Sequence, residues 1–186
     1  MVSQFIVISR MHLITFQMNL TYRRYFEEFF MNEKNDLRNA LGCYTTGVTI
    51  ITTSDQNHNP VGLTINSFTS LSLDPPLIMW GISNNTPSID AFRHRKLFAV
   101  NILTNEQSQL LKIFATPSNN KFKEVSWKMN DRNLPIIDGC VASFECTTHS
   151  IFPGGDHDIY VGKIIEYSYT DKTPLILSRG KAINSI

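Results

Sequence analysis

The sequence predicts one mainly β domain whose sheet closes as a barrel, with a few short helices around it. Segments rich in β-branched residues, such as residues 47–53 (GVTIITT), follow one another at close spacing with turn residues between them. Segments with a helical pattern are few and short. Closure as a barrel is expected because it removes the exposed edges that an open sheet of such strands would present.

The first half of the domain is predicted to contain strands at residues 47–53, 61–68, 77–82 and 97–103. A polar run at 54–60 indicates a hairpin turn between the first two strands. Asp74-Pro75-Pro76 is expected to stop regular pairing before the third, because proline has no amide hydrogen to donate to a ladder. Short helices are predicted at 36–44 and 87–95, the second with Thr86 or Ser88 as its cap.

The second half begins with a helix predicted at residues 106–114. Residues 116–135 are rich in Asn, Lys, Pro and Asp and are expected to form a long loop. The remaining predicted strands lie near residues 139–147, 157–169 and 174–178. The sequence contains no internal repeat and no low-complexity tract.

Composition excludes several classes of protein. Among 186 residues, 42% are apolar and 18% charged, which is typical of a folded globular chain. A net charge of +1 provides no overall attraction to nucleic acid or to an anionic membrane. The sparse cysteines form no C-x-x-C pair, and the apolar stretch at 5–16 is too short and polar to span a bilayer. We therefore expect a cytoplasmic protein with no export signal.

Residues 1–30 differ from the rest and are assigned as an N-terminal extension, with residues 31–186 as the domain. Methionine recurs in this extension, and no strand or helix period is sustained. Two interpretations stay open. Translation starts at Met31 and the extension is not native, or a native helix packs on the body of the protein. The mass of the native protein distinguishes them.

Common catalytic signatures are absent from the sequence, including G-x-S-x-G, the phosphate-binding G-x-x-x-x-G-K and G-x-G-x-x-G. The most unusual segment is residues 62–77 (GLTINSFTSLSLDPPL), a strand that runs into a stretch of hydroxyl and amide groups. Such a segment offers neutral donors to a polar heterocycle. On composition alone, however, an ordinary Ser/Thr-rich turn is favoured.

A second unusual segment is residues 154–163 (GGDHDIYVGK), in which His157 leads directly into a strand. His157 could bind a metal with His149 or its flanking aspartates, but the spacing fits no standard ligand pattern, so no metal site is expected. It could also be a solvated loop histidine, or it could face a ligand from the end of the strand. The residues alone leave the last two interpretations open.

Together these segments resemble the flavin reductase family, small FMN-binding split-barrel proteins that serve two-component flavin monooxygenases. The similarity runs from about Leu37 to Lys181. The landmarks that carry it are residues 62–77, 98–103 (FAVNIL), 139–146 (GCVASFEC), 155–157 (GDH) and 178–180 (SRG). Their common order favours a ligand role for the first segment and for His157.

The resemblance implies a split β-barrel that binds FMN or FAD and accepts a hydride from NADH or NADPH. The flavin ring would contact Thr64, Ile65, Asn66 and Ser67, with Thr45 and Thr46 nearby. The phosphate would lie between Ser83 and Ser88 at the start of a helix. Arg93, Arg95 and Lys96 are weaker phosphate candidates, and Phe68 and Trp80 either adjoin the flavin or belong to the core.

In the same resemblance, His157 is the catalytic residue on the nicotinamide side. Asp156 would orient the turn, and Arg179 would close over the nucleotide. Pro153, just before the turn, departs from the family pattern. No acid, base or nucleophile is required, because the flavin carries the redox chemistry and the protein positions the two rings.

The expected function is an NAD(P)H-dependent flavin reductase that supplies reduced flavin to a partner monooxygenase by diffusion. No residue in the sequence distinguishes FMN from FAD. A homodimer is implied by the resemblance. Two alternatives stay open: a related split-barrel oxidase, against which the Gly-Asp-His turn argues, and a flavin-binding carrier or sensor without turnover. No ribose-binding residue distinguishes NADH from NADPH.

Overall fold

The computed structural model describes residues 31–33, 35–118 and 120–183. The chain divides into two compact units, Met1–Tyr44 and Thr45–Ile186. In the first unit, residues 31–33 and 35–41 are helical, so the predicted helix forms but ends before Tyr44. Leu37 and Leu41, on its predicted apolar face, are exposed. The predicted extension, residues 1–30, lies outside the described residues.

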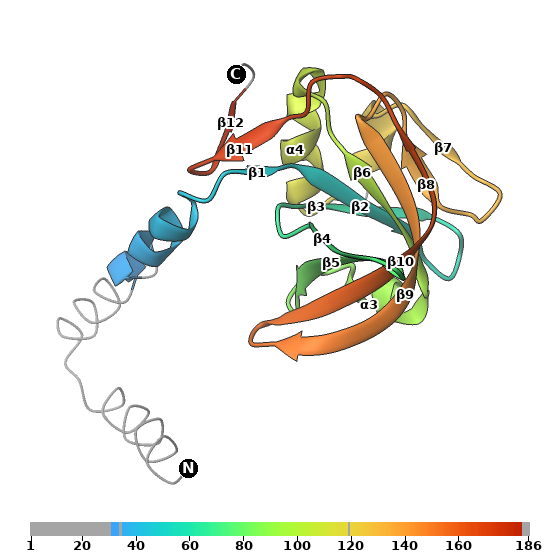
Figure 1. The fold of residues 1–186 in the computed structure, drawn as a ribbon, viewed down its shortest axis with the longest axis horizontal. Coiled ribbons are helices and arrows are strands. Elements are labelled where there is room, and N and C mark those ends of the chain that lie inside the picture. The colour runs from blue at the N-terminus through green and yellow to red at the C-terminus, as the bar shows by residue number, and fades with distance from the viewer. Residues whose placement is uncertain (1–30, 34, 119, 184–186) are drawn as a thin grey trace, which may run out of the picture. The chain divides into compact units, whose positions relative to one another are not determined.

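The second unit is built on a seven-stranded antiparallel sheet with the order β3-β2-β6-β9-β10-β5-β4. Its strands are β2 (Thr49–Ser54), β3 (Pro60–Ile65), β4 (Thr69–Leu73), β5 (Pro76–Ser83), β6 (Leu97–Ile102), β9 (Ala142–Gly154) and β10 (His157–Tyr169). Figure 1 shows the sheet curling on itself, with β9 and β10 as its longest hairpin. The predicted mainly β class is confirmed.

Smaller elements surround this sheet. A three-stranded sheet has the order β1-β11-β12, and β7 pairs with β8. These strands are β1 (Thr46–Gly47), β7 (Trp127–Met129), β8 (Pro135–Ile137), β11 (Ile176–Ser178) and β12 (Lys181–Ile183). The helices are α3 (Ile89–His94), α4 (Ser108–Ala115) and the short 3₁₀ turns η1 (Asn105–Gln107) and η2 (Lys121–Glu124). Among the described residues, no helix has the length and apolarity needed to cross a membrane.

The core lies on both faces of β2, every residue of which is buried. Ile51 packs in one cluster with Trp80 and Phe98, whereas Ile50 packs in a second cluster with Phe114. A strand covered on both faces needs apolar or hydrogen-bonded side chains throughout. This explains why β2 is a continuous β-branched run and shows no alternation of polar and apolar residues.

The sheet is open between its two edge strands, β3 and β4. These strands are consecutive in sequence and are joined by residues 66–68, yet they stand at opposite ends of the strand order. Among the described strands, β3 pairs only with β2, and β4 pairs only with β5. Their outer backbone N–H and C=O groups therefore take no part in a ladder between described strands, although the Gly62 carbonyl of β3 accepts a hydrogen bond from Lys121.

Several predicted boundaries are wrong. The strand predicted at 61–68 ends at Ile65, and β4 was missed because its hydroxyl residues are mostly exposed and produce no apolar alternation. Pro76 opens β5 and pairs with Leu73, so the proline pair forms a turn and does not end the ladder. The loop predicted at 116–135 contains η2 and β7.

Candidate functional site

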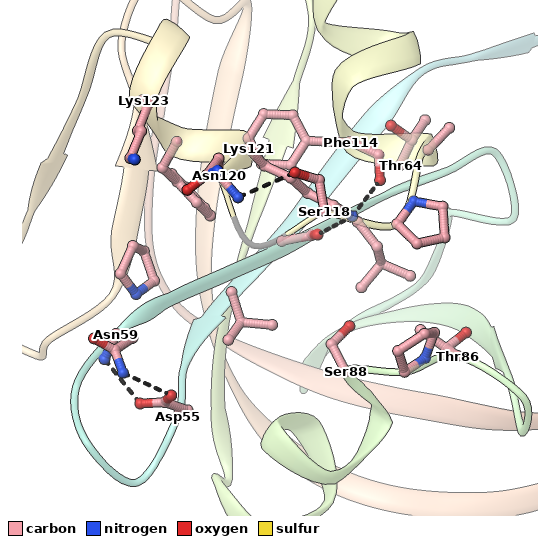
Figure 2. Close-up of a pocket in the computed structure, with 18 of the residues that line it drawn as sticks. Asp55, Asn59, Thr64, Thr86, Ser88, Phe114, Ser118, Asn120, Lys121 and Lys123 are labelled. Carbon is pink, nitrogen blue, oxygen red and sulfur yellow. Dashed lines mark hydrogen bonds between the residues drawn. The ribbon is translucent and has the colours of Figure 1, made fainter.

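A cavity of about 1220 Å³ lies beside the open edge of the sheet. Three segments form its walls: the β2–β3 hairpin, the turn between β5 and α3, and the chain from α4 to β7. Figure 2 shows Thr86 and Ser88 across the cavity from Phe114 and Lys121. A space of this size lined by mixed apolar and polar groups is typical of a small-molecule site.

The turn at residues 83–88 forms one wall of the cavity and was predicted to hold a phosphate. Ser83 and Ser88 both line the cavity. The Ser83 hydroxyl accepts a hydrogen bond from the Asn85 amide at 3.3 Å, and the Thr86 amide bonds the Ser83 carbonyl at 3.0 Å. Ser88 precedes α3 and makes no side-chain capping bond, so its hydroxyl can serve a ligand. Helix α3 has six residues, so hydroxyls and amides of the turn matter more than its dipole.

The four residues predicted to contact the flavin ring differ in what they can offer. Thr64 lines the cavity, but its hydroxyl donates to the Leu111 carbonyl at 2.8 Å. The Ile65 side chain is buried in the core, so only its backbone could meet a ligand. Asn66 is exposed in the link between β3 and β4.

Ser67, the fourth of these residues, ties that link to β5. Its hydroxyl accepts a hydrogen bond from the Gly81 amide at 3.0 Å and lies 3.3 Å from the Gly81 carbonyl. Ser67 therefore fixes the link in place, and it can accept or donate to a ligand only by sharing these bonds.

His157 is the first residue of β10, which pairs with β5, and it lies directly opposite Ser83 in that ladder. A Cβ atom added to Gly81 would lie 3.7 Å from the Ser67 hydroxyl oxygen and 3.9 Å from His157 Cδ2. Ser67 and His157 thus flank the same glycine. The structure brings the two unusual segments of the sequence together at this point.

The His157 ring is anchored by its neighbour. Its Nδ1 lies 2.7 Å from Asp156 Oδ1. This hydrogen bond, and then the charge of the histidine, lower the pKa of the Asp156 carboxyl. Within the described part of the chain, no group of three metal-ligating side chains could hold an ion.

Lys121 lines the cavity and was not singled out from the sequence. Its ammonium donates to the carbonyls of Phe114 at 2.9 Å and Gly62 at 3.1 Å. Burial lowers the pKa of this amine, and no carboxylate pairs with it among the described residues. A half-buried cation with only neutral partners is suited to an anion. Lys121 was not predicted from the sequence, because it lies in a segment rich in Asn and Lys and belongs to no recognisable motif.

Thr45, Thr46 and Arg179 lie elsewhere, on or beside the three-stranded sheet. The Thr45 hydroxyl donates to Ser178 at 3.2 Å, and Thr46 pairs with Leu177 of β11. Arg179 occupies the turn before β12 with a positive φ of 50°. None of the three lines the cavity. The buried residue Val48 lies between β1 and β2, and β1 pairs with β11, outside the main sheet.

The aromatic candidates differ in position. Trp80 is fully buried and stacks on Tyr160 with ring centres 4.7 Å apart, so it belongs to the core. Phe68 is half-buried and stacks on Phe144 at 6.2 Å, close to the open edge. Of the two residues, only Phe68 lies in the β3–β4 link.

The weaker phosphate candidates do not line the cavity. Arg93 is paired with Asp158 at 2.8 Å. Arg95 donates to Ser54 and, at 2.6 Å, to the Arg132 carbonyl. Lys96 is exposed immediately before β6. The phosphate contacts predicted for these three side chains are therefore not supported by their positions.

Comparison with known proteins identifies relatives over most of the chain. A family model described as the flavin reductase like domain matches residues 41–184. The FMN reductase (NADH) SmoA of Agrobacterium fabrum is 39% identical over 143 residues, which cover 77% of this chain and 81% of that protein. The reductase component of the flavin-dependent trigonelline monooxygenase of Acinetobacter baylyi is also 39% identical, over 138 residues. This match covers 74% of the chain but only 44% of that longer protein.

A similar architecture occurs in solved structures. The NADH:FAD oxidoreductase SgcE6 of Streptomyces globisporus, in complex with NAD and FAD fragments, superposes with a TM-score of 0.78 and 32% identity. The superposition covers 82% of this chain and 92% of that one. The predicted split-barrel fold is thereby confirmed.

Proposed function

Because the chain belongs to the flavin reductase like domain family, we propose that it is an NAD(P)H-dependent flavin reductase acting on FMN or FAD. The observation that carries the proposal is the adjacency of three features: the open β3–β4 edge, the cavity wall at Thr64 and Ser83, and His157, which pairs with Ser83 and flanks Gly81 together with Ser67. When bound, the flavin supplies the redox chemistry by accepting a hydride from the nicotinamide. The protein supplies binding and orientation.

In this proposal the protein makes two kinds of contact with the flavin, one with the ring and one with the phosphate. The backbone edge at residues 64–67 and the Asn66 amide face the polar side of the ring. Ser83, Ser88 and the Lys121 ammonium surround the phosphate from opposite walls. This arrangement uses neutral donors for a neutral ring and one cation for the charged group.

His157 is the proposed catalytic residue on the nicotinamide side. It stands one strand away from the cavity wall at Ser83, with its ring held by Asp156. A nicotinamide placed against His157 would lie over the opening next to Ser67, so that the two rings can stack. Arg179, Thr45 and Thr46 keep their predicted roles in nucleotide and flavin binding only as proposals, because they neither line the cavity nor, unlike His157, pair with a residue that does.

Substitution of the histidine tests this function. The purified protein is loaded with FMN or FAD and mixed anaerobically with NADH or NADPH while flavin absorbance is followed. The wild-type flavin should bleach, and His157→Ala should bind flavin normally but bleach slowly. A wild-type flavin that stays oxidised would indicate a carrier or sensor. Unchanged bleaching in the variant would remove His157 from the mechanism.

We also propose a homodimer that passes reduced flavin to a separate oxygenase. Large apolar side chains are exposed on β4 and on the distal part of β10, including Leu71, Leu73, Tyr167 and Tyr169. Leu73 is 93% exposed, which is unusual for leucine on an edge strand. Light scattering should give twice the chain mass for the wild type and the monomer mass for Leu73→Asp. A monomeric wild-type protein would contradict this part of the proposal.

A cytoplasmic location is proposed from the cysteines, since Cys43, Cys140 and Cys146 are all free thiols. Burial raises the pKa of both Cys140 and Cys146 to about 12, so these two thiols are protonated and inert at neutral pH. Fractionation of the native cell tests the location.

A further inference from the structure

Arg93 of α3 contacts two turns that belong to different parts of the proposed site. Its Nε and Nη2 both donate to Asp158 Oδ2, at 3.2 and 2.8 Å. The same Nη2 donates to Asn84 Oδ1 at 3.2 Å. Asp158 follows His157 in β10, and Asn84 follows Ser83 in the cavity turn. One guanidinium thus links the histidine strand to the wall of the flavin cavity.

The two turns are also joined through their backbones. The Asn84 amide donates to the Asp156 carbonyl at 2.9 Å, and Ser83 pairs with His157 across the ladder. This backbone contact occurs at the very end of β5 and β10, where ladders fray most easily. The Arg93 side chain adds a connection on the outer side of that end. It therefore restrains the position of His157 relative to Ser83.

The burial and hydrogen bonding of Arg93 and its partners indicate that the orientation of Asp158 and Asn84 around the guanidinium is fixed. The Asp158 side chain is only 17% exposed, whereas Arg93 is 43% exposed. A forked guanidinium that meets a carboxylate and an amide oxygen at once holds both in one orientation, which a lysine ammonium on a flexible stem does not. Because its charge is already paired with Asp158, Arg93 is less suited to bind a ligand phosphate than Lys121, which has no carboxylate partner among the described residues.

We propose that Arg93 is a positioning residue for hydride transfer, acting through Asp158 and Asn84 to hold His157 and the flavin cavity in register. This inference rests on the proposed reductase function. It assigns Arg93 no contact with flavin or nicotinamide. The residue acts only on the separation and orientation of the groups that make those contacts.

The test compares Arg93→Gln, His157→Ala and the double variant by anaerobic stopped-flow mixing of flavin-loaded protein with NADH. Arg93→Gln should lower the limiting rate of flavin reduction about tenfold, because small misplacements of reacting groups have large effects. Flavin affinity, measured separately by fluorescence quenching, should change less than about twofold. In the His157→Ala background, Arg93→Gln should have no further effect. Equal effects in both backgrounds would mean that Arg93 acts on overall structure and would overturn the proposal.

Arg132 provides a matched control. It is 42% exposed and pairs with two carboxylates, Glu145 and Glu166, each at 2.7 Å, and it does not line the cavity. Arg132→Gln removes two ion pairs and should leave the limiting rate unchanged. If Arg132→Gln lowered the limiting rate of flavin reduction as much as Arg93→Gln, the loss of any surface ion pair would explain the effect. The specific role proposed for Arg93 would then be wrong.

Hydrogen exchange separates failure of this inference from failure of the proposed function. In Arg93→Gln, amides in residues 83–88 and 154–158 should exchange faster, whether or not the protein reduces flavin. If the wild type fails to reduce flavin but both turns loosen in the variant, the reductase function is wrong while the link stands. If neither segment changes its exchange rate, Arg93 does not restrain these turns.

Discussion

Replacement of Lys121 by methionine tests the cavity assignment most directly. The methionine side chain keeps the length and apolar stem of lysine but removes the ammonium. That ammonium has three hydrogens, two of which point to the carbonyls of Phe114 and Gly62. One donor and the whole charge are left for a ligand. The substitution should therefore weaken binding of a phosphorylated flavin specifically.

The size of the effect follows from this single remaining donor. A hydrogen bond that involves a charged group contributes about 1.5–3 kcal/mol when its partner would otherwise be left unsatisfied. This corresponds to a rise of roughly 10- to 150-fold in the Kd for FMN. Riboflavin has the same ring without the phosphate, so its Kd should change little.

Fluorescence quenching of each flavin measures both constants under the same conditions. Lys128→Met is the control, because Lys128 is an exposed lysine of β7 that does not line the cavity. It should bind FMN as the wild type does. Equal weakening of FMN and riboflavin in Lys121→Met would mean that the substitution only disturbs the cavity wall. Unchanged FMN binding would place the phosphate elsewhere.

Further predictions concern the surroundings of the same lysine. Because burial lowers the pKa of Lys121, FMN affinity should fall as pH rises through that lowered pKa. Lys121→Met should lose this dependence, which FMN titrations at a series of pH values would reveal. In Gly62→Ala, the new Cβ would lie 2.7 Å from the Phe114 ring, which should destabilise the fold by about 1–3 kcal/mol and also weaken FMN binding. Gly162→Ala, with its Cβ 2.5 Å from Phe98, should destabilise the fold similarly but spare FMN affinity. Urea denaturation and FMN titration check both glycine variants, and equal FMN affinities in the two would contradict the reasoning.

The sequence predicts those parts of the fold in which local pattern and burial agree. Strand β2 is β-branched because both of its faces are covered, so residues 47–53 were recognisable. Strand β10 was predicted at residues 157–169, the range that the structure shows. By contrast, β4 lies on an edge, and its exposed hydroxyl residues look like those of a loop.

Some residues of the candidate site could likewise be predicted from the sequence, and others could not. Ser83, Ser88 and Thr64 were recognisable within their motifs and do line the cavity. Lys121 was missed, because what distinguishes it is burial without a carboxylate partner, which only the folded chain reveals. The assignment of residues 1–30 as an extension remains a proposal that the mass of the native protein would test.

The gap between β3 and β4 has a consequence for how a ligand can move. In a fully paired barrel, entry to the interior from the side requires the rupture of a row of interstrand bonds. Here the two flanking strands share no row, since each is paired only on its other side among the described strands. A ligand bound at this seam would therefore break no interstrand ladder when it leaves. Release without such a rupture would suit the proposed delivery of a diffusing flavin to a second enzyme.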